Sequence, residues 1–321
     1  MKQSEPISKR LKTGSPGLRH QDLRSWLVAL AFFLASAAVL FGLLFELFTG
    51  SFWGWLPFLH YIVLGGFVIA LLTSFVLAPA ILSRGIRSYE NSPEALARML
   101  ERLSSRCGFR KPPKFMFQDT PEANAAAYQS ILGRRVVVTR GLVELYQAGK
   151  ITDDEMEAIL AHELGHLKYF HTLKRGLVLS WSSVFYYVGI GMMAGGTVVM
   201  MAARKTEYKL GGAAAAFLGA IILLVSLIVK AIGFVNLRRH EYEADAYSTA
   251  VKGTHLASAL QKMEQHNTAL REVAKILPDG DSWTVRPKAV NWVERLFDTH
   301  PSTAKRIERI KTLSATWGVS G

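Results

Sequence analysis

The chain has very little cysteine, with the one residue Cys107 among 321. A single thiol cannot form an intrachain disulfide, so the protein belongs to no disulfide-stabilised class and fits a reducing compartment. Cys107 follows a helix that we expect to begin near Ser92, Pro93 and Glu94, and nothing near it in the sequence would activate a thiol. We therefore interpret it as a small buried residue and not as a nucleophile.

Acidic residues are scarce relative to basic ones, at 25 against 38, which gives a formal net charge of +13. A nucleic-acid binder can carry such an excess, but here the basic residues do not alternate with aromatic ones as they do in nucleic-acid modules. We interpret the charge as an orientation signal and as attraction to a membrane surface, with no nucleic-acid partner. The sequence also has no evident internal repeat or long low-complexity segment.

Long hydrophobic runs are abundant instead. Half of the residues are hydrophobic, and the mean hydropathy of +0.19 is high for a soluble domain. Buried helices of a soluble enzyme would be the alternative, but they rarely lack a polar face over such lengths. Because ~20 apolar residues cross a bilayer, we expect a lipid-embedded protein with transmembrane helices near residues 26–48, 55–82, 177–203 and 213–234.

The first hydrophobic run has a second interpretation. Ala35, Ser36 and Ala37 resemble a signal-peptide cleavage site that follows a basic tail and a short apolar region. However, apolar sequence continues to Phe48, whereas a signal peptide is followed by polar sequence after the cut. We therefore expect this run to be an uncleaved anchor.

Basic residues near the ends of the runs predict the orientation of the chain. They are numerous before the first run and at the ends that an even number of crossings places on the same side, and they outnumber Arg204, Lys205 and Lys209 in the opposite loop. Both termini should therefore be cytoplasmic. The expected organisation is a basic tail over 1–24, transmembrane hairpins over 25–83 and 176–236, and cytoplasmic catalytic parts over 84–175 and 237–321.

The pentapeptide HELGH at residues 162–166 is the most specific motif of the chain. Residues four apart share one face of a helix, so His162 and His166 can bind one Zn²⁺ while Glu163 lies beside the position of a bound water. Thr152 and Glu155 form the pattern of a capping box that would start this helix. Gly165 is costly inside a helix, which suggests a close approach of another element there. The alternative is an amphipathic core helix with two incidental histidines.

A catalytic zinc also needs a third protein ligand, for which a second expected helix offers candidates. Glu241 and Asp245 are four apart and share a face, so one can bind the metal while the other accepts a hydrogen bond from a ligand histidine. His240 is a competing ligand, and Glu243 should point away from that face. A solvated helix surface is the alternative for each of these charged residues.

Three motifs follow one another along the chain: HELGH, then RHEYEAD at 239–245, then THP at 299–301 followed by Arg306 and Ile307. In this order they resemble the motifs of the membrane zinc metallopeptidases of the HtpX type and of the related CAAX prenyl endopeptidases. The similarity also includes the NAAA segment at 124–127 and spans roughly residues 90 to 310. This resemblance implies that Glu241 is the third zinc ligand and that Asp245 orients a ligand histidine. The family has an aromatic residue where this chain has Ala126, which affects the expected shape of the substrate cleft.

The expected fold is mainly α-helical and multi-pass, with four transmembrane helices and a cytoplasmic zincin-like metallopeptidase domain that contains a small β-sheet. Strands are expected near residues 114–118, 123–129 and 134–139. The zinc helix should run straight into the third span, because His166 and Gly176 are only about 15 Å apart by helix rise. On such a continuous helix His171 would lie opposite His162, at the membrane interface.

The expected chemistry is hydrolysis of peptide bonds, with one Zn²⁺ per chain held by His162, His166 and Glu241 and with Glu163 as the general base. We expect extended peptide or membrane-protein substrates to add to the strand edge. The resemblance implies an integral protein of a bacterial inner membrane, and the basic residues place its active site on the cytoplasmic side. A dedicated processing protease of the CAAX type and a non-catalytic metal-binding scaffold or chaperone are the alternatives. Further candidate residues are His300 as an oxyanion donor, Arg306 as an orienting cation, and Asn124, Ala125 and Ala126 as the substrate edge.

Overall fold

The computed structural model describes residues 94–130, 133–276 and 301–319. The basic tail, the first two expected spans and His300 lie outside these residues. The described part of the chain divides into two compact units: residues 94–172 together with 237–319, and residues 173–236. The first unit contains the predicted metal-binding motifs and the second consists of helical segments.

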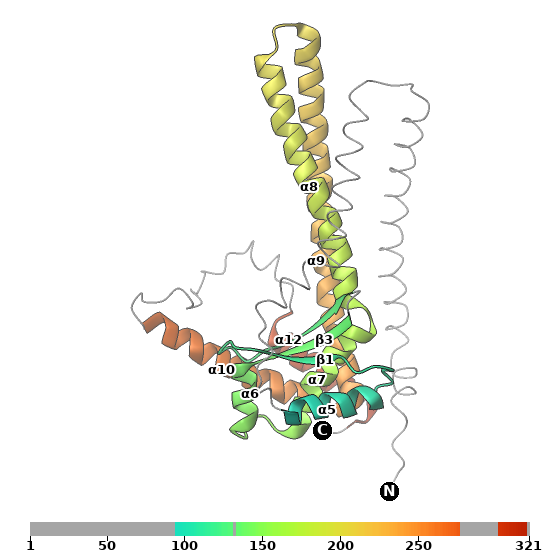
Figure 1. The fold of residues 1–321 in the computed structure, drawn as a ribbon, viewed down its shortest axis with the longest axis vertical. Helices are drawn as coiled ribbons and strands as arrows, with labels where there is room; N and C mark the ends of the chain where they lie inside the picture. The colour runs from blue at the N-terminus through green and yellow to red at the C-terminus, as the bar shows by residue number, and fades with distance from the viewer. Residues whose placement is uncertain (1–93, 131–132, 277–300, 320–321) are drawn as a thin grey trace. The chain divides into compact units, whose positions relative to one another are not determined.

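The first unit contains a three-stranded sheet and several helices (Figure 1). The strands β1 (Lys114–Gln118), β2 (Ala125–Ser130) and β3 (Gly133–Thr139) are arranged in the order β1-β3-β2. β3 pairs in parallel with β1 and antiparallel with β2, so β2 is an edge strand. The small sheet that the sequence predicted is confirmed, with strand ends within two residues of the expected ones. The helices are α5 (Glu94–Arg106), α6 (Arg140–Gln147), α7 (Asp153–Lys168), α10 (His255–Ile276), α12 (Thr303–Trp317) and the parts of α8 (His171–Ala202) and α9 (Thr206–Lys252) that lie in this unit.

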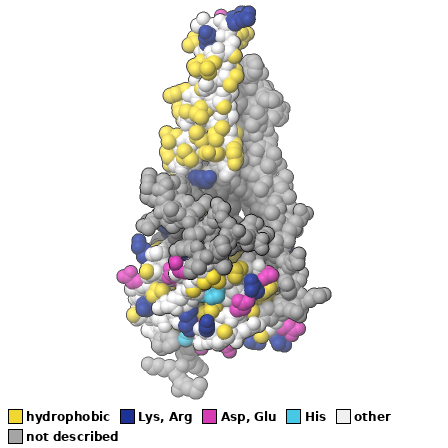
Figure 2. Space-filling view, turned by 90° about the vertical axis from the view of Figure 1, so that its left-hand side faces the viewer, with side chains coloured by type: hydrophobic (Ala, Val, Ile, Leu, Met, Phe, Trp, Pro, Cys, Tyr) yellow, Lys and Arg dark blue, Asp and Glu magenta, His cyan; other side chains and the backbone are white. Residues whose placement is uncertain are grey.

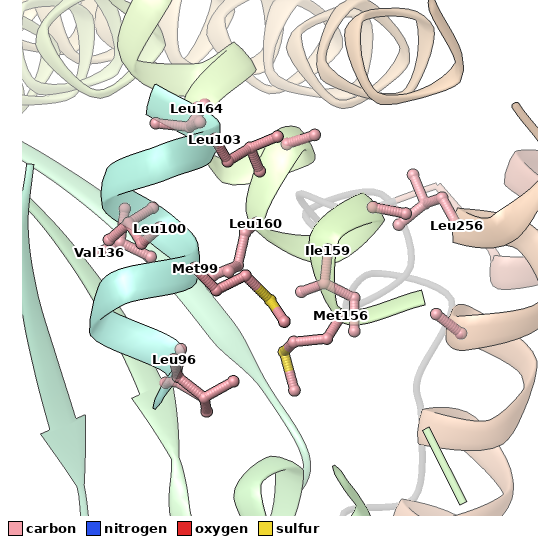
Figure 3. Close-up of a cluster of buried hydrophobic side chains, with 14 of the residues drawn as sticks. Leu96, Met99, Leu100, Leu103, Val136, Met156, Ile159, Leu160, Leu164 and Leu256 are labelled. Carbon is pink, nitrogen blue, oxygen red and sulfur yellow. The ribbon is translucent and has the colours of Figure 1, made fainter. Parts of the chain in front are cut away.

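Apolar side chains from α5, α7, α10 and β3 form the core of the first unit (Figure 3). α5 repeats leucine and methionine at helical spacing, and this stripe is buried against α7, which is itself buried on nearly all sides. Cys107 is buried in the same cluster, as the sequence predicted. The core residues shown are Leu96, Met99, Leu100, Leu103, Val136, Met156, Ile159, Leu160, Leu164 and Leu256.

α7 begins where the sequence predicted. The Thr152 hydroxyl accepts a hydrogen bond from the Glu155 backbone N–H, and the Glu155 carboxylate accepts one from the Thr152 backbone N–H at 2.8 Å. This capping box satisfies two backbone donors that the helix itself leaves open. The Glu155 carboxylate also accepts hydrogen bonds from Lys262 Nζ and the Ser258 hydroxyl of α10. The start of α7 is thus fixed by its own cap and by a second helix.

Gly165 lies where α7 meets α9. A Cβ atom at this position would be 3.1 Å from both Ala244 Cα and Tyr247 Cβ, so the two helices approach more closely than alanine would allow without a shift. The expected close approach at Gly165 is confirmed. This contact brings the HELGH turn of α7 to the part of α9 that carries Glu241 and Asp245.

The prediction that the helix carrying HELGH runs straight into the third span was wrong. α7 ends at Lys168, Phe170 adopts a left-handed backbone conformation with φ 57°, and α8 begins at His171. A non-glycine residue in this conformation ends the regular run of helical hydrogen bonds. The break turns His171 toward the interior, where only 3% of its surface is exposed.

The second unit contains a pair of antiparallel helical segments from α8 and α9 (Figure 1). Within the described residues, the windows Phe185–Ala202 and Thr206–Ala231 are long and apolar enough to cross a membrane, in agreement with the last two predicted spans. Hydrophobic side chains cover much of the visible face of this hairpin (Figure 2). Gly196 and Gly212 let the two backbones approach closely, because a Cβ on Gly196 would lie 2.5 Å from the Gly212 carbonyl oxygen.

Candidate metal centre

Two helices bring three potential metal ligands together. His162 and His166 come from α7, and Glu241 comes from α9. One ligand atom from each residue lies within 4.8 Å of the others. The two imidazole Nε2 atoms are 3.1 Å apart, and each lies 3.6 Å from a carboxylate oxygen of Glu241. The three residues that were predicted as metal ligands therefore lie close together in the structure.

The separations between these atoms fit a zinc ion. Ligand bonds of about 2.0–2.1 Å in a tetrahedral site separate the ligand atoms by about 3.3 Å. The observed 3.1 and 3.6 Å separations lie on either side of that value. Two imidazoles and one carboxylate are also a donor set used by catalytic zinc sites, in which the fourth position remains for water. The residues present thus fit the expected metal.

Asp245 and Arg306 support the His162 side of the cluster. Asp245 is fully buried, and its Oδ1 lies 3.0 Å from His162 Nδ1. Arg306 of α12 donates to both carboxylate oxygens of Asp245, from Nη2 at 2.6 Å and from Nε at 2.9 Å. Arg306 Nη1 also lies 3.6 Å from Glu241. The guanidinium thus balances the charge of the carboxylates that surround His162.

The electrostatics of the cluster favour a positive charge at its centre. Burial lowers the pKa of His162, but hydrogen bonds to Asp245 and Glu241 outweigh it and raise the pKa to about 9. Burial lowers the pKa of His166 to about 3, against the opposing attraction of Glu241. Burial raises the pKa of Asp245, whereas Arg306 and His162 bring it below its ordinary value. The carboxylates around His162 thus favour a cation at this point, whether a proton on the ring or a bound metal ion.

Glu163 is the residue of the motif that the geometry leaves outside the ligand cluster. It follows His162 directly on α7 and is 6% exposed. Its negative charge is felt by Arg306, whose pKa burial lowers but Asp245, Glu241 and Glu163 raise above its ordinary value. A buried carboxylate beside two candidate ligands is suitably placed to exchange a proton with a water in the site.

His171 is a functional candidate that the sequence analysis misplaced. Its Nδ1 lies 3.1 Å from His166 Nδ1, and its Nε2 lies 2.8 Å from a carboxylate oxygen of Glu243. It is therefore no membrane-interface residue, because the break at Phe170 removes the helical periodicity on which that prediction depended. Glu243 is not part of the three-residue cluster, and its carboxylate lies against His171. The ring of His240 stacks on His171 with centroids 4.2 Å apart, and His240 is not part of the three-residue cluster.

The predicted substrate edge lies on β2, which contacts α7. The Thr139 N–H donates to the Asn124 carbonyl, so the alternation of an antiparallel pair directs the backbone groups of Ala126 toward β3 and those of Ala125 and Ala127 toward the outer edge. The Asn124 side-chain oxygen accepts a hydrogen bond from the Ala125 N–H at 2.9 Å. The Thr172 hydroxyl donates to the Ala127 carbonyl at 3.2 Å.

A helix far along the chain fixes the start of this edge. Asn267 of α10 accepts a hydrogen bond from the Ala123 N–H at 2.8 Å and donates one to the Ala123 carbonyl at 3.0 Å. Nothing in the sequence pattern indicated Asn267, because a polar residue on a helix is ordinarily solvated. These two hydrogen bonds hold Ala123, which is 1% exposed, just before β2, the strand that contacts α7.

Comparisons with known proteins agree with this geometry. The profile of peptidase family M48 matches residues 90–314. A protease HtpX homolog from Aeropyrum pernix is 30% identical over 282 residues, which cover 77% of this chain and 84% of the relative. A protease HtpX homolog from Tropheryma whipplei is 29% identical over 304 residues, covering 92% and 97% of the two chains.

A solved structure shares the fold. The crystal structure of Ste24p from S. mikatae aligns with a TM-score of 0.50 and 20% sequence identity, covering 90% of this chain and 67% of that one. The resemblance to HtpX-type metallopeptidases is thereby confirmed, and the family has zinc metalloproteases as members. Since the family profile covers well over half of the sequence, the chain belongs to peptidase family M48.

Proposed function

We propose that this protein is a membrane-bound, zinc-dependent endopeptidase that cleaves membrane proteins at the cytoplasmic surface. The observation that carries the proposal is the convergence of His162, His166 and Glu241 on one point, with the buried Glu163 beside them. One zinc ion per chain would bind there. The membership in a peptidase family and the identity with HtpX homologs support hydrolysis of peptide bonds as the reaction.

Glu163 would carry the proton transfers of the reaction. Zinc held by the three ligands would polarise a water and lower its pKa toward neutrality. Glu163 would take the proton of that water during attack on the peptide carbonyl and later return it to the leaving amine. The Nδ1–H of His162 would donate a hydrogen bond to Asp245, which leaves Nε2 of the same ring free to bind the metal.

Arg306 and His300 would stabilise negative charges in the site. Arg306 would orient Asp245 and Glu241, since it already donates to the former and lies beside the latter. Its two hydrogen bonds to Asp245 support a role behind His162 in preference to a contact with the substrate. His300, which lies outside the described residues, is proposed from the sequence as the donor to the developing oxyanion.

An extended substrate would add to the outer edge of β2. Ala125 would supply the outward backbone groups, Ala126 would present its side chain, and Asn124 would hold the strand end in position. The Thr172 hydroxyl already donates to the Ala127 carbonyl, and the Ala125 N–H already donates to Asn124 Oδ1, so pairing with the substrate would use the Ala125 carbonyl and the Ala127 N–H. A flexible, extended segment would therefore suit the site better than folded protein.

The location of substrates follows from the membrane segments. α9 carries both the apolar window Thr206–Ala231 and Glu241, and the basic residues of the sequence favour a cytoplasmic side for the metal motifs. Damaged or misfolded membrane proteins that expose a loop near that surface would be accessible. The likeness to Ste24p concerns the fold and does not favour a prenylated substrate.

The test compares two glutamate-to-glutamine changes on the same helix. Glu163→Gln should reduce cleavage of casein or of an unfolded membrane-protein segment by about 10²–10⁴-fold, because an amide cannot accept the proton. Zinc content of the purified full-length protein should stay at one ion per chain. Glu157→Gln, which removes a half-buried carboxylate that pairs with Arg106 and Lys252 away from the ligand cluster, serves as the matched control and should retain activity.

Retention of activity by Glu163→Gln would refute the peptidase mechanism. Binding of zinc by the wild type without cleavage of any substrate would instead support the non-catalytic scaffold. Cleavage without zinc, in the presence of a chelator, would refute the metal assignment.

A further inference from the structure

The second candidate ligand has a support that differs from the one behind the first. Behind His162 stands a carboxylate, whereas behind His166 stands another histidine. His166 Nδ1 and His171 Nδ1 are 3.1 Å apart, and His171 Nε2 lies 2.8 Å from Glu243. Both His171 and Glu243 are 3% exposed, so water has little access to these contacts. A continuous line of side chains thus runs from Glu243 to the ligand cluster.

The contacts in this line specify the position of each proton. A His166 ring that binds a metal through Nε2 has its proton on Nδ1, and that N–H requires an acceptor. The nearest acceptor is His171 Nδ1, which can accept only if His171 carries its own proton on Nε2. The Nε2 proton then points at the Glu243 carboxylate, which accepts it. The carboxylate therefore fixes both tautomers in turn.

The surroundings hold His171 in the orientation that this line requires. The ring of His240 stacks on it with an interplanar angle of 8° and centroids 4.2 Å apart. Tyr169 stacks on it as well, with centroids 5.6 Å apart. The left-handed residue Phe170 directs the chain so that α8 can start with His171 in this place. The ring thus has contacts on its faces and hydrogen bonds at both nitrogens.

We propose that His171, anchored by Glu243, is a positioning residue that sets the tautomer and ring orientation of His166 for metal binding. The inference rests on the proposed metal site. It extends the usual carboxylate–histidine–metal arrangement by one imidazole, so that Glu243 acts on the ligand through His171. The neighbouring Thr172 holds the β2 edge at Ala127, so the first two residues of α8 support both the ligand and the substrate edge.

The test measures zinc affinity of the purified full-length protein, by competition with a chromophoric chelator. His171→Leu removes the acceptor and should weaken zinc binding by about 10- to 100-fold. His171→Gln should recover most of that loss, because the amide oxygen can accept from His166 while the amide N–H donates to Glu243. Glu243→Gln preserves the shape but not the charge, and should weaken binding by about 10-fold.

A spectroscopic measurement separates positioning from packing. Cobalt(II) added in place of zinc should give an altered visible spectrum in His171→Leu and a nearly native one in His171→Gln, because the spectrum reports ligand geometry. Thr152→Ala is the control for general destabilisation, since it removes the cap at the other end of α7. It should leave both the zinc affinity and the cobalt spectrum unchanged.

The outcomes distinguish this inference from the proposed function. Unchanged zinc affinity in both His171→Leu and Glu243→Gln would overturn the positioning role, and so would equal losses in His171→Leu and His171→Gln. If His171→Leu does not fold, Glu243→Gln and His171→Gln still decide the matter. A wild-type protein that binds no zinc, or a His166→Ala variant that binds it normally, would instead refute the metal site itself.

Discussion

The two ends of α7 differ in the partners of their polar side chains. At its beginning, Thr152 and Glu155 cap each other, and Lys262 neutralises the Glu155 carboxylate, so the protein supplies all the partners itself. At its other end, His162 and His166 point their Nε2 atoms at each other across 3.1 Å and toward Glu241. Two imidazole nitrogens at this distance repel unless a proton or a metal lies between them. The first end thus serves folding, and the second end serves a ligand.

The comparison shows how one helix can carry both tasks. Gly165 and its contact with α9 hold the functional end in place through packing, and the capping box holds the other end through hydrogen bonds. Because the two attachments use different residues, changes at one end should affect stability and changes at the other should affect metal binding. The following predictions test that separation, starting with the largest effect.

His166→Ala should abolish zinc binding and reduce peptidase activity to background, since only two ligands remain. His166 is neutral in the metal-free protein because burial depresses its pKa to about 3, so its removal leaves no uncompensated charge. The melting temperature of the metal-free variant should therefore stay near that of the metal-free wild type, although its activity is lost. Zinc analysis and thermal unfolding of protein in detergent would measure the two effects. A large loss of metal-free stability would show that the ends of α7 are not separable.

Gly165→Ala should affect both properties, because Gly165 lies within the HELGH turn and also packs α7 against α9. The added Cβ would meet backbone and Cβ atoms of α9 at 3.1 Å, and such overpacking costs about 1–3 kcal/mol. The better helix propensity of alanine would offset about 1 kcal/mol of that cost. The shift of α7 against α9 would also move His166 relative to Glu241, so we expect weaker zinc binding together with a modest loss of stability. Zinc affinity equal to the wild type would show that the ligand cluster tolerates the shift.

Glu155→Gln should lower stability by about 1–3 kcal/mol near neutral pH and leave zinc affinity unchanged. Burial raises the pKa of Glu155, but Lys262, Ser258 and Thr152 bring it below its ordinary value in the folded protein. A lowered folded pKa contributes stability above the unfolded value of about 4.3, and this contribution is lost as the pH falls through the folded value.

The stability gap between the wild type and Glu155→Gln should therefore shrink when metal-free samples are unfolded at about pH 3 instead of pH 7. Glu101→Gln, a change of the same kind on the exposed face of α5, is the control and should give no gap at either pH. A gap that grows in acid would contradict the assignment of Glu155 to a charge-stabilised cap.

Local patterns predicted much of this structure. The capping box, the strands and the close approach at Gly165 depend on residues near one another in sequence or on one steric rule, and all three are confirmed. The ligand cluster was also anticipated, because i and i+4 spacing on two helices fixes which side chains share a face, and the family resemblance supplied the pairing of the helices.

The break at Phe170 could not be predicted in the same way. Tyr169 and Phe170 carry no helix-breaking signal, and the residue that follows the break, His171, has its partner Glu243 72 positions away. The hydrogen bond between the Ala123 N–H and the Asn267 side chain likewise joins residues 144 positions apart. Sequence periodicity assumes a continuous helix and reports one element at a time, so it misses residues whose roles arise from contacts between distant elements.

The order in which the site enters the growing chain follows from the contact of Arg306 with His162, whose positions differ by 144. Synthesis runs from the N-terminus, so the HELGH helix exists before Glu241 and Asp245, and these exist before Arg306. Contacts of such wide separation also form slowly, because long loops must close first. The nascent polypeptide therefore carries an incomplete hydrolytic centre during much of its translation, and the enzyme matures only after its α12 segment has been made.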